Sequence, residues 1–281
     1  MAPHAKQQIL IQINEDAPLM LITENLLKLR LKNDQPVVGT WSIISSPIVV
    51  EILALSGFDF LILDMEHGVY DQTALDACIR ACEAAGCAPI VRVPGINPSA
   101  VQWALDMGAH GIVVPQVVNA ASAEMAVGMT KFAPVGTRGY NPFTRAAGYA
   151  APSSNQGGKL RNDFGLTSVI VENQTALNEL DAILAIEDLD VVYVGVYDLS
   201  IALGYEGDTK HPVICQILDQ TIARVRSAGK IAGLMVRSKV DVAKAIKLGA
   251  RFLVYSVDTS ILREAAKDAV AAFTQGVSDA Q

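Results

Sequence analysis

Short runs of apolar residues alternate along the chain with longer segments in which apolar positions recur every three or four residues. The short runs are typical of parallel strands buried on both faces, and the longer segments are typical of amphipathic helices. We predict eight strands, over residues 37–41, 58–63, 88–93, 111–114, 168–171, 191–194, 231–236 and 252–255.

The helical segments between these strands carry recognisable end signals. Pro47 lies near the first turn of one segment, where proline is favoured. Gly86, Gly108 and Gly249 each mark the end of a helical segment, as glycine commonly does. The predicted helices cover residues 22–33, 47–56, 71–85, 100–107 and 240–248.

Eight strands that alternate with helices predict an α/β fold with a parallel sheet and right-handed crossovers. Eight is also the number of strands that closes a (β/α)8 TIM barrel. We therefore expect a single barrel domain over residues 21–281, preceded by an N-terminal extension, residues 1–20, without a clear period. An open doubly wound sheet is the alternative, but residues 39–42 do not form its Gly-rich nucleotide loop.

The longest irregular segment covers residues 134–166, between a helix and the fifth strand. It contains several Gly, Ser and Ala residues, and residues 138–149 add aromatic and basic side chains. Long loops in compact domains are usually functional or mobile. We expect this segment to cover the mouth of the barrel.

Composition narrows the possible partners. The 281 residues are 51% hydrophobic, which permits a large core. The formal net charge of −7, without a Lys- or Arg-rich run, argues against a nucleic-acid partner. No apolar stretch approaches the roughly 18 residues that span a bilayer, and the N-terminus lacks the order of a secretory signal. We expect a cytoplasmic protein with neither nucleic-acid nor membrane partners.

The four cysteines, Cys78, Cys82, Cys87 and Cys215, do not have the spacing of a zinc site. Cys78 and Cys82 share a helix face, so a soft-metal pair is conceivable, but no Cys or His cluster completes a tetrahedral set. We expect reduced, half-buried thiols.

Polar residues able to act in catalysis follow most of the predicted strands. In a parallel barrel, the carboxyl ends of the strands meet at one rim, where active sites lie. Each such residue alone is more often a helix cap or a surface charge, but Arg92 within an apolar strand needs an anionic partner. The residues expected at this rim are Trp41, Asp64, Glu66, His67, Arg92, Gln116, Glu172, Asp198 and Asp258.

The residue types at this rim suggest a reaction. Glu172 and Asp198 come from adjacent predicted strands. Together with water and a chelating substrate, they suit a hard divalent cation such as Mg²⁺ or Mn²⁺, which can stabilise an enolate as a Lewis acid. Arg92 would hold a carboxylate or an oxyanion by forked hydrogen bonds.

His67 would move protons near neutral pH, with Asp64 or Glu66 fixing its tautomer. Together with a metal and an arginine, this describes deprotonation next to a carbonyl, the core step of a metal-dependent aldolase. No lysine lies at a strand end where it would form a Schiff base, because Lys230 precedes its strand and would lie at the opposite rim.

A series of motifs, taken in order, identifies a known family. They are GTWS at residues 39–42, GFDF through DMEH at 57–67, VRVP at 91–94, VVPQ at 113–116, GTRG at 136–139, VEN at 171–173, DLS followed by LG at 198–204, and SVDT at 256–259. From about Asn25 to Phe273, the chain resembles the HpcH/HpaI-type class II pyruvate aldolases. These include hydroxy-oxoheptanedioate aldolases and 2-keto-3-deoxy-sugar-acid aldolases.

The resemblance implies a (β/α)8 barrel, often with its last helix exchanged between subunits, assembled as a hexamer. It implies that Glu172 and Asp198 bind a divalent metal (Mg²⁺, Mn²⁺ or Co²⁺), that Arg92 binds the pyruvate oxygen, and that His67 and Asp64 form a proton-transfer dyad. It places further substrate-contacting residues at Trp41, which lines the aldehyde pocket, at Asp106, which reaches a neighbouring subunit's site, and at Gln116, Val196 and Asp198.

Two positions depart from the family pattern. Ile170 stands where many members have Gln two residues before the metal-binding Glu, and Val196 stands in place of the Pro of a Gly-Pro pair. Ile170 cannot hydrogen-bond a bound water or the substrate, so the geometry at the metal and the preferred aldehyde would differ from the usual ones.

We therefore expect a carbon–carbon lyase, a class II aldehyde-lyase. It would reversibly cleave a 4-hydroxy-2-oxo acid to pyruvate and an aldehyde through a metal-bound enolate, as a homo-oligomer. The nearest alternatives are other reactions of the pyruvate enolate on the same scaffold: oxaloacetate decarboxylation, a citrate-forming synthase or a macrophomate-type synthase. A non-catalytic binding protein is a more distant alternative.

Overall fold

Eight parallel strands close into a barrel in the computed structural model, which describes residues 24–149 and 162–281. Each strand pairs with the next one along the chain, and β8 pairs with β1. The strands are β1 Val37–Ser42, β2 Phe60–Asp64, β3 Ala88–Arg92, β4 Gly111–Val114, β5 Leu166–Val171, β6 Val191–Val194, β7 Ile231–Val236 and β8 Phe252–Val257. The predicted (β/α)8 barrel is confirmed, whereas the predicted extension, residues 1–20, lies outside the described residues.

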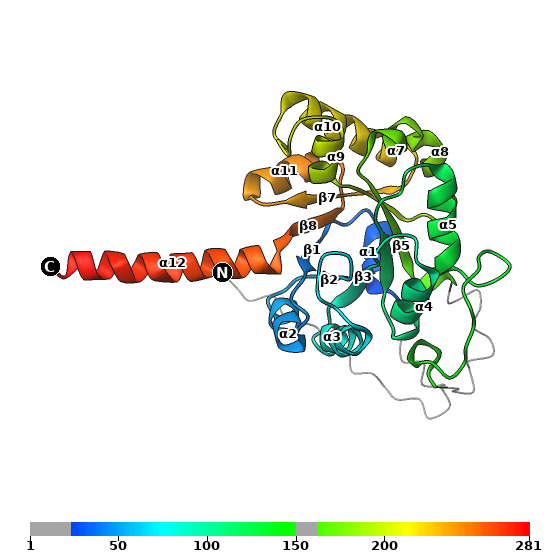
Figure 1. The fold of residues 1–281 in the computed structure, drawn as a ribbon, viewed down its shortest axis with the longest axis horizontal. Helices are drawn as coiled ribbons and strands as arrows, with labels where there is room; N and C mark the ends of the chain where they lie inside the picture. Colours follow the sequence, from blue (N-terminus) through cyan, green and yellow to red (C-terminus); the bar gives the residue numbers. More distant parts are fainter. Residues whose placement is uncertain (1–23, 150–161) are drawn as a thin grey trace.

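Helices surround the barrel, as Figure 1 shows. Several begin at Asn, Asp or Ser residues whose side chains accept a backbone N–H of the first turn, which satisfies a donor that the helix itself cannot. The helices are α1 Leu26–Lys32, α2 Pro47–Leu55, α3 Gln72–Ala84, α4 Pro98–Asp106, α5 Ala120–Thr130, α7 Gln174–Asn178, α8 Leu180–Leu184, α9 Val196–Ala202, α10 Pro212–Ser227, α11 Lys239–Leu248 and α12 Asp258–Asp279, with a 3-10 turn η1 at Arg145–Ala147.

The predicted element bounds agree with the structure to within a few residues. Strands 111–114, 191–194 and 231–236 are confirmed as predicted, and the other strands differ by one or two residues at an end. The first helix, predicted over 22–33, begins at Leu26 because Asn25 caps it by accepting the backbone N–H of Lys28. Residues 22 and 23 of that prediction lie outside the described residues.

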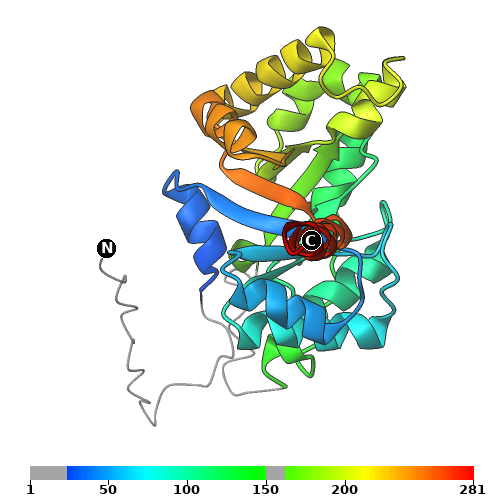
Figure 2. The same cartoon turned by 90° about the vertical axis from the view of Figure 1, so that its left-hand side faces the viewer.

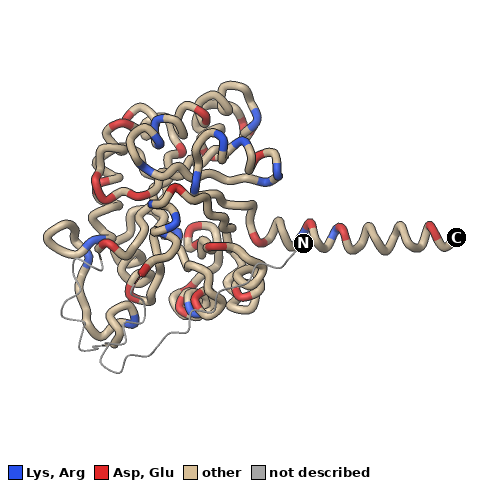
Figure 3. Tube along the Cα trace, turned by 180° about the vertical axis from the view of Figure 1, so that it is seen from behind, with Lys and Arg blue, Asp and Glu red and all other residues tan. Residues whose placement is uncertain are grey.

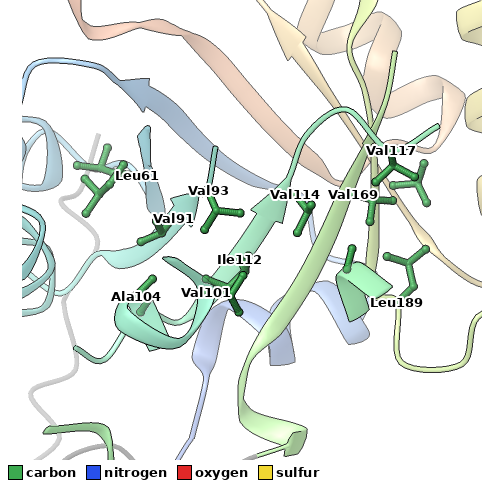
Figure 4. Packing of buried hydrophobic residues seen from close by; sticks show 14 of the residues in the cluster. Leu61, Val91, Val93, Val101, Ala104, Ile112, Val114, Val117, Val169 and Leu189 are labelled. Carbon is green, nitrogen blue, oxygen red and sulfur yellow. The ribbon is translucent and has the colours of Figure 1, made fainter. Parts of the chain in front are cut away.

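Side chains alternate between two apolar layers along each strand, because successive residues of a strand point to opposite faces. One layer fills the inside of the barrel and includes Phe60, Ile90 and Phe252, with the two phenyl rings stacked at 4.2 Å between centroids. The other layer lies between the barrel and its helices. Part of this outer layer is drawn in Figure 4, where Val91, Ile112 and Val169 are labelled.

The segment that we expected to cover the barrel mouth lies instead at the opposite rim in its described parts. Arg138 pairs with Asp106 at the end of α4, and Arg145 bonds the carbonyl of Met107 and the carboxylate of Glu83 at the end of α3. For these described parts the prediction was wrong, because they belong to a connection from the end of a helix to the start of a strand. In a (β/α)8 barrel such a connection crosses the amino-terminal rim.

The last helix, α12, leaves the barrel and projects into solvent, as Figures 1 and 2 show from two directions. Every residue of α12 from Leu262 onward is exposed. Figure 3 shows that charged residues lie near the start of α12 and at its far end, so the stretch between Asp268 and Asp279 is uncharged. Among the described residues, none of the helices has both the length and the apolar composition needed to cross a membrane.

Candidate active site

A cavity of about 250 Å³ opens at the carboxyl ends of the barrel strands. Several strands end at the wall of this cavity. Residues two apart on a strand share a face, so the inward-facing residues of each strand continue into the wall. Of the predicted site residues, the wall of the cavity contains Trp41, Asp64, His67, Arg92, Glu172, Val196 and Asp198. The structure thus brings together six of the nine residues that the strand-end argument placed at this rim, all except Glu66, Gln116 and Asp258.

Arg92 is held by two carboxylates. Asp64 and Arg92 are register partners on β2 and β3, and Arg92 Nε lies 2.7 Å from Asp64 Oδ1 while Nη2 bonds Oδ2 of the same group. Arg92 Nη1 lies 3.0 Å from Glu66 Oε2. Burial lowers the pKa of Arg92, but the hydrogen bonds and charge of these carboxylates outweigh it and raise the pKa overall. The guanidinium is therefore a fixed cation in the cavity wall.

Trp41 supports the same guanidinium from one side. Arg92 Cζ lies 4.3 Å from the centroid of the Trp41 ring, which is cation–π distance. Trp41 in turn meets Tyr193 edge-on, with ring centroids 5.6 Å apart. Burial raises the pKa of Tyr193, so its hydroxyl stays neutral. The aromatic pair fixes the plane of the guanidinium.

The predicted dyad of His67 and Asp64 has a different geometry in the structure. The Asp64 carboxylate accepts the backbone N–H groups of Glu66 and His67 and binds Arg92, but no hydrogen bond joins it to the His67 imidazole. The imidazole is 67% exposed, and Glu66 Oε2 lies 4.0 Å from its Nε2. In this structure Asp64 therefore holds Arg92, which lies directly across the strand pair, and the dyad of Asp64 with the His67 imidazole stays a prediction.

Glu172 follows β5 and faces into the cavity, where it is 9% exposed. Its Oε1 accepts the backbone N–H of Gln116 at 2.6 Å. Burial raises the pKa of Glu172 to about 7, and the charges of Asp198 and Glu66 add to the rise against the Gln116 hydrogen bond. This carboxylate lacks a full countercharge.

Gly195 makes room for Glu172. A Cβ at Gly195 would lie 2.8 Å from the Cβ of Glu172 and 2.9 Å from its Oε2, so any side chain there would displace the carboxylate. Asp198 stands three residues further on, in the first turn of α9, and lines the same cavity.

The charge balance of the cavity fits a divalent cation. Four carboxylates, those of Asp64, Glu66, Glu172 and Asp198, interact around one guanidinium, that of Arg92. Among the described residues, no group of three or more Cys, His, Asp or Glu is arranged to hold a metal by itself. Glu172 and Asp198 offer two carboxylates only, which suits Mg²⁺, since this ion typically binds one or two carboxylates and keeps water or substrate oxygens as its other ligands.

Two other predicted residues are placed differently. Gln116 has a positive φ of 57° and supports the carboxylates, with its side-chain nitrogen 2.7 Å from Glu66 Oε1. Asp106 lies at the end of α4, at the amino-terminal rim, where Arg138 binds it at 2.6 Å. Within one chain, Asp106 is therefore not part of the cavity.

Asp258, which we expected at the catalytic rim, stabilises the fold through hydrogen bonds. Its Oδ2 accepts hydrogen bonds from Ser42 Oγ at 3.0 Å and from the backbone N–H groups of Ile43 and Ile44 at 3.0 and 2.9 Å. Tyr70 bonds both Ser42 and the carbonyl of Ile44. Asp258 thus ties the loop after β1 to the start of α12.

Sequence reasoning missed several side chains that line the cavity, among them Tyr193, Tyr197 and Met235. Tyr193 and Met235 lie within strands and face the inside of the barrel. The alternation of each strand, continued to its carboxyl end, would have found both. Tyr197 precedes Asp198 in α9 and has no comparable signal in the sequence.

Comparison with known proteins gives matches over most of the chain. This chain is 32% identical to a 5-keto-4-deoxy-D-glucarate aldolase of Salmonella arizonae. The match extends over 243 residues, which are 86% of this chain and 94% of that relative. A solved HpcH/HpaI aldolase/citrate lyase family protein from Burkholderia cenocepacia is 31% identical, with a TM-score of 0.84 over 89% of this chain and 99% of that one. A solved citrate synthase, SbnG, is 29% identical, with a TM-score of 0.81 over 89% and 98%.

The family model described as HpcH/HpaI aldolase/citrate lyase matches residues 38–265, a range that contains all eight strands except the first residue of β1 and every cavity residue named above. The resemblance inferred from the motifs is thereby confirmed. The chain belongs to the HpcH/HpaI aldolase/citrate lyase family, and the predicted class of enzyme, a carbon–carbon lyase, is confirmed with it.

Proposed function

We propose that this chain is a divalent-metal-dependent aldolase that reversibly cleaves a 4-hydroxy-2-oxo acid to pyruvate and an aldehyde. The observation that carries the proposal is the meeting, in one cavity, of an undercompensated carboxylate pair, Glu172 and Asp198, and a rigid guanidinium, Arg92. A 2-oxo acid offers complementary groups to both, because its adjacent oxygens can chelate a cation while one of them accepts hydrogen bonds.

Arg92 retains donors for the substrate. A guanidinium has five N–H groups. Asp64 accepts two of them, from Nε and Nη2, and Glu66 forms an ion pair with Nη1, so each terminal nitrogen keeps an N–H group for the substrate. Held in plane by Trp41, these donors would bind the oxygen that becomes negative as the enolate forms.

Glu172 and Asp198 would hold the cation, which supplies a Lewis acid for the 2-oxo group. The raised pKa of Glu172 supports this assignment, since a buried carboxylate without a countercharge gains most from a cation. Gly195 keeps the space beside that carboxylate open.

His67 would accept the proton of the 4-hydroxyl group, directly or through a water molecule. Its backbone is fixed by Asp64, and its imidazole lies at the edge of the cavity. As the hydroxyl proton leaves, the C3–C4 bond breaks and its electron pair passes to the C2 carbonyl oxygen. The aldehyde and the pyruvate enolate result, and C3 of the enolate then takes up a proton to give pyruvate.

The test is an aldol addition assay with pyruvate and a panel of aldehydes, with and without chelator, for the wild type, Glu172→Gln and Asp198→Asn. We expect metal-dependent product in the wild type and a loss of Mn²⁺ binding by calorimetry in both variants. Glu179→Gln is the matched control, because Glu179 lies outside the cavity and accepts the backbone N–H of Ala120. Full activity in excess chelator would refute the metal assignment.

The likeness to a citrate synthase favours a second candidate, addition of a different enolate to a 2-oxo acid in the same cavity. Incubation with oxaloacetate, alone and with acetyl-CoA, distinguishes the two by product. Citrate formation that exceeds aldol addition would replace the first proposal. Pyruvate formed from oxaloacetate alone would instead indicate decarboxylation.

We further propose that the chain is a homo-oligomer in which α12 packs on another copy. In a (β/α)8 barrel the last helix normally covers the neighbouring strands, whereas here it projects away. Its exposed apolar residues, Leu262, Val270, Phe273 and Val277, would find apolar partners in Ile48, Ile52 and Leu55, which are exposed on α2. Light scattering of the wild type and of Phe273→Glu tests this. An unchanged mass would contradict it, and a hexamer is the expected assembly.

A further inference from the structure

Arg237 directly follows β7, on the side of the strand that faces the inside of the barrel. Ile231 and Met235 face the inside of the barrel, and Met235 lines the cavity. Arg237 follows two residues later and therefore starts from the same face of the strand. Its guanidinium lies over the ring of Tyr197, with Cζ 5.2 Å from the ring centroid, and Tyr197 also lines the cavity. Because Tyr197 lines the cavity and is 38% exposed, the Arg237 guanidinium over its ring lies next to the cavity mouth.

The backbone of Arg237 is held on both sides. Its carbonyl accepts the hydroxyl of Tyr255 at 2.9 Å, and its N–H donates to Asp241 Oδ2 at 3.1 Å. Asp241 is itself fixed in the first turn of α11, where its N–H donates to the N-cap Ser238. The backbone that carries the Arg237 side chain is therefore fixed, and the Tyr197 ring limits where the guanidinium can lie.

The guanidinium of Arg237 forms no ion pair within the described residues, in contrast to that of Arg92. The cavity wall carries negative charge from Glu172 and Asp198, and the nearby charge of Glu66 acts on Glu172 as well. These charges repel an anionic substrate group unless a cation receives it. Arg237 supplies that cation, and its hydrogen-bond donors are not occupied by a carboxylate.

We propose that Arg237 and Tyr197 form the specificity site for a carboxylate at the far end of the aldehyde half of the substrate. The inference rests on the proposed aldolase function, in which Arg92 and the Glu172–Asp198 pair hold the pyruvate half inside the cavity. The aldehyde half then extends toward the mouth. Arg237 donates a fork of hydrogen bonds to its carboxylate, and the Tyr197 hydroxyl is a further donor.

The test compares acceptors of equal length with and without the acid group, in aldol addition to pyruvate. The acids are 4-oxobutanoate and 5-oxopentanoate, and the neutral aldehydes are butanal and pentanal. The measured quantity is the ratio of kcat/KM for the acid to kcat/KM for the neutral aldehyde. A charge-assisted fork at this partly exposed position predicts that Arg237→Gln lowers the ratio by about 10- to 100-fold, mainly through KM.

Two further variants of Arg237 and one control variant test the proposal more closely. Arg237→Lys keeps the charge without the fork and should restore part of the ratio, whereas Arg237→Glu should lower it below that of Arg237→Gln. Lys247→Gln removes the same charge near the end of α11, at the opposite rim, and should leave the ratio unchanged. If the wild type adds aldehydes to pyruvate but the ratio is the same in all Arg237 variants, the specificity site is refuted and the aldolase function stands. If no aldehyde is accepted at all, both fail.

Discussion

The guanidinium of Arg92 lies between the Trp41 ring, 4.3 Å from Cζ, and the carboxylate of Asp64, which is its register partner on the neighbouring strand. One contact fixes the plane of the cation and the other fixes its rotation in that plane. The two remaining terminal N–H groups are thus presented to the cavity by residues from three adjacent strands, β1, β2 and β3. A substrate oxygen would meet donors that need no rearrangement.

Arg92→Lys tests this arrangement. Lysine keeps the positive charge but cannot bind both oxygens of Asp64, Glu66 and the substrate at once. We expect kcat/KM for aldol cleavage to fall by roughly 10²–10³. Thermal denaturation should show a folded protein, because Asp64 keeps a positively charged neighbour. Near-normal kinetics in this variant would show that Arg92 has only a structural role.

Much of this site follows from strand periodicity, and the remainder depends on register. Asp64, Arg92 and Glu172 each lie two residues beyond an inward-facing core residue, so an apolar strand that ends in a charge locates the cavity. The sequence does not say which residues of neighbouring strands stand opposite each other. In the structure the register places Asp64 opposite Arg92, whereas the sequence analysis paired Asp64 with His67.

The position of the long irregular segment, predicted at the mouth of the barrel, also depended on more than composition. The segment from residue 134 onward was assigned to the mouth because of its length and composition. Chain direction was the stronger constraint, since Arg138 and Arg145 anchor the segment at the ends of α4 and α3. The aromatic residues Tyr140, Phe143 and Tyr149 are exposed near that rim and do not contribute to the cavity.

Glu172 should make the metal-free protein less stable at neutral pH than at acid pH. Its pKa is about 7 in the folded state and 4.5 in an ordinary glutamate, so between these values the folded state binds more protons than the unfolded chain. Stability that this group contributes below about pH 4.5 is therefore lost as the pH rises to about 7, by up to about 3 kcal/mol.

Urea unfolding in chelator, at several pH values across that window, measures the effect in wild type and in Glu172→Gln. Because glutamine does not titrate, the stability of the wild type relative to the variant should fall as the pH rises. Saturating Mn²⁺ should reverse the trend in the wild type only. Parallel pH profiles for the two proteins would contradict the raised pKa.

Asp258→Ala should destabilise the protein rather than remove a catalytic group. The variant leaves the backbone N–H groups of Ile43 and Ile44 and the hydroxyl of Ser42 without their acceptor. We expect a loss of about 2–3 kcal/mol in the free energy of unfolding and a smaller loss for Asp258→Asn, which retains one acceptor oxygen. Chemical denaturation measures both. A fully stable Asp258→Ala protein with low activity would instead indicate that Asp258 takes part in catalysis.

His67→Ala distinguishes aldol cleavage from decarboxylation in the same cavity. Aldol cleavage requires a base for the substrate hydroxyl, whereas oxaloacetate loses carbon dioxide without giving up a proton. We therefore expect aldol cleavage to fall by roughly 10²–10⁴ and any oxaloacetate decarboxylation to fall much less. Initial rates of the two reactions on the same preparation give the comparison.

His67→Gln serves as the matched variant, because it keeps a polar side chain at this 67% exposed position but cannot act as a base near neutral pH. It should behave like His67→Ala in aldol cleavage. Equal losses of both reactions in both variants would mean that His67 supports the metal or substrate site as a whole. Retention of both reactions would remove His67 from the mechanism and leave Glu66, whose carboxylate lies 4.0 Å from the imidazole, as the proton acceptor to test next.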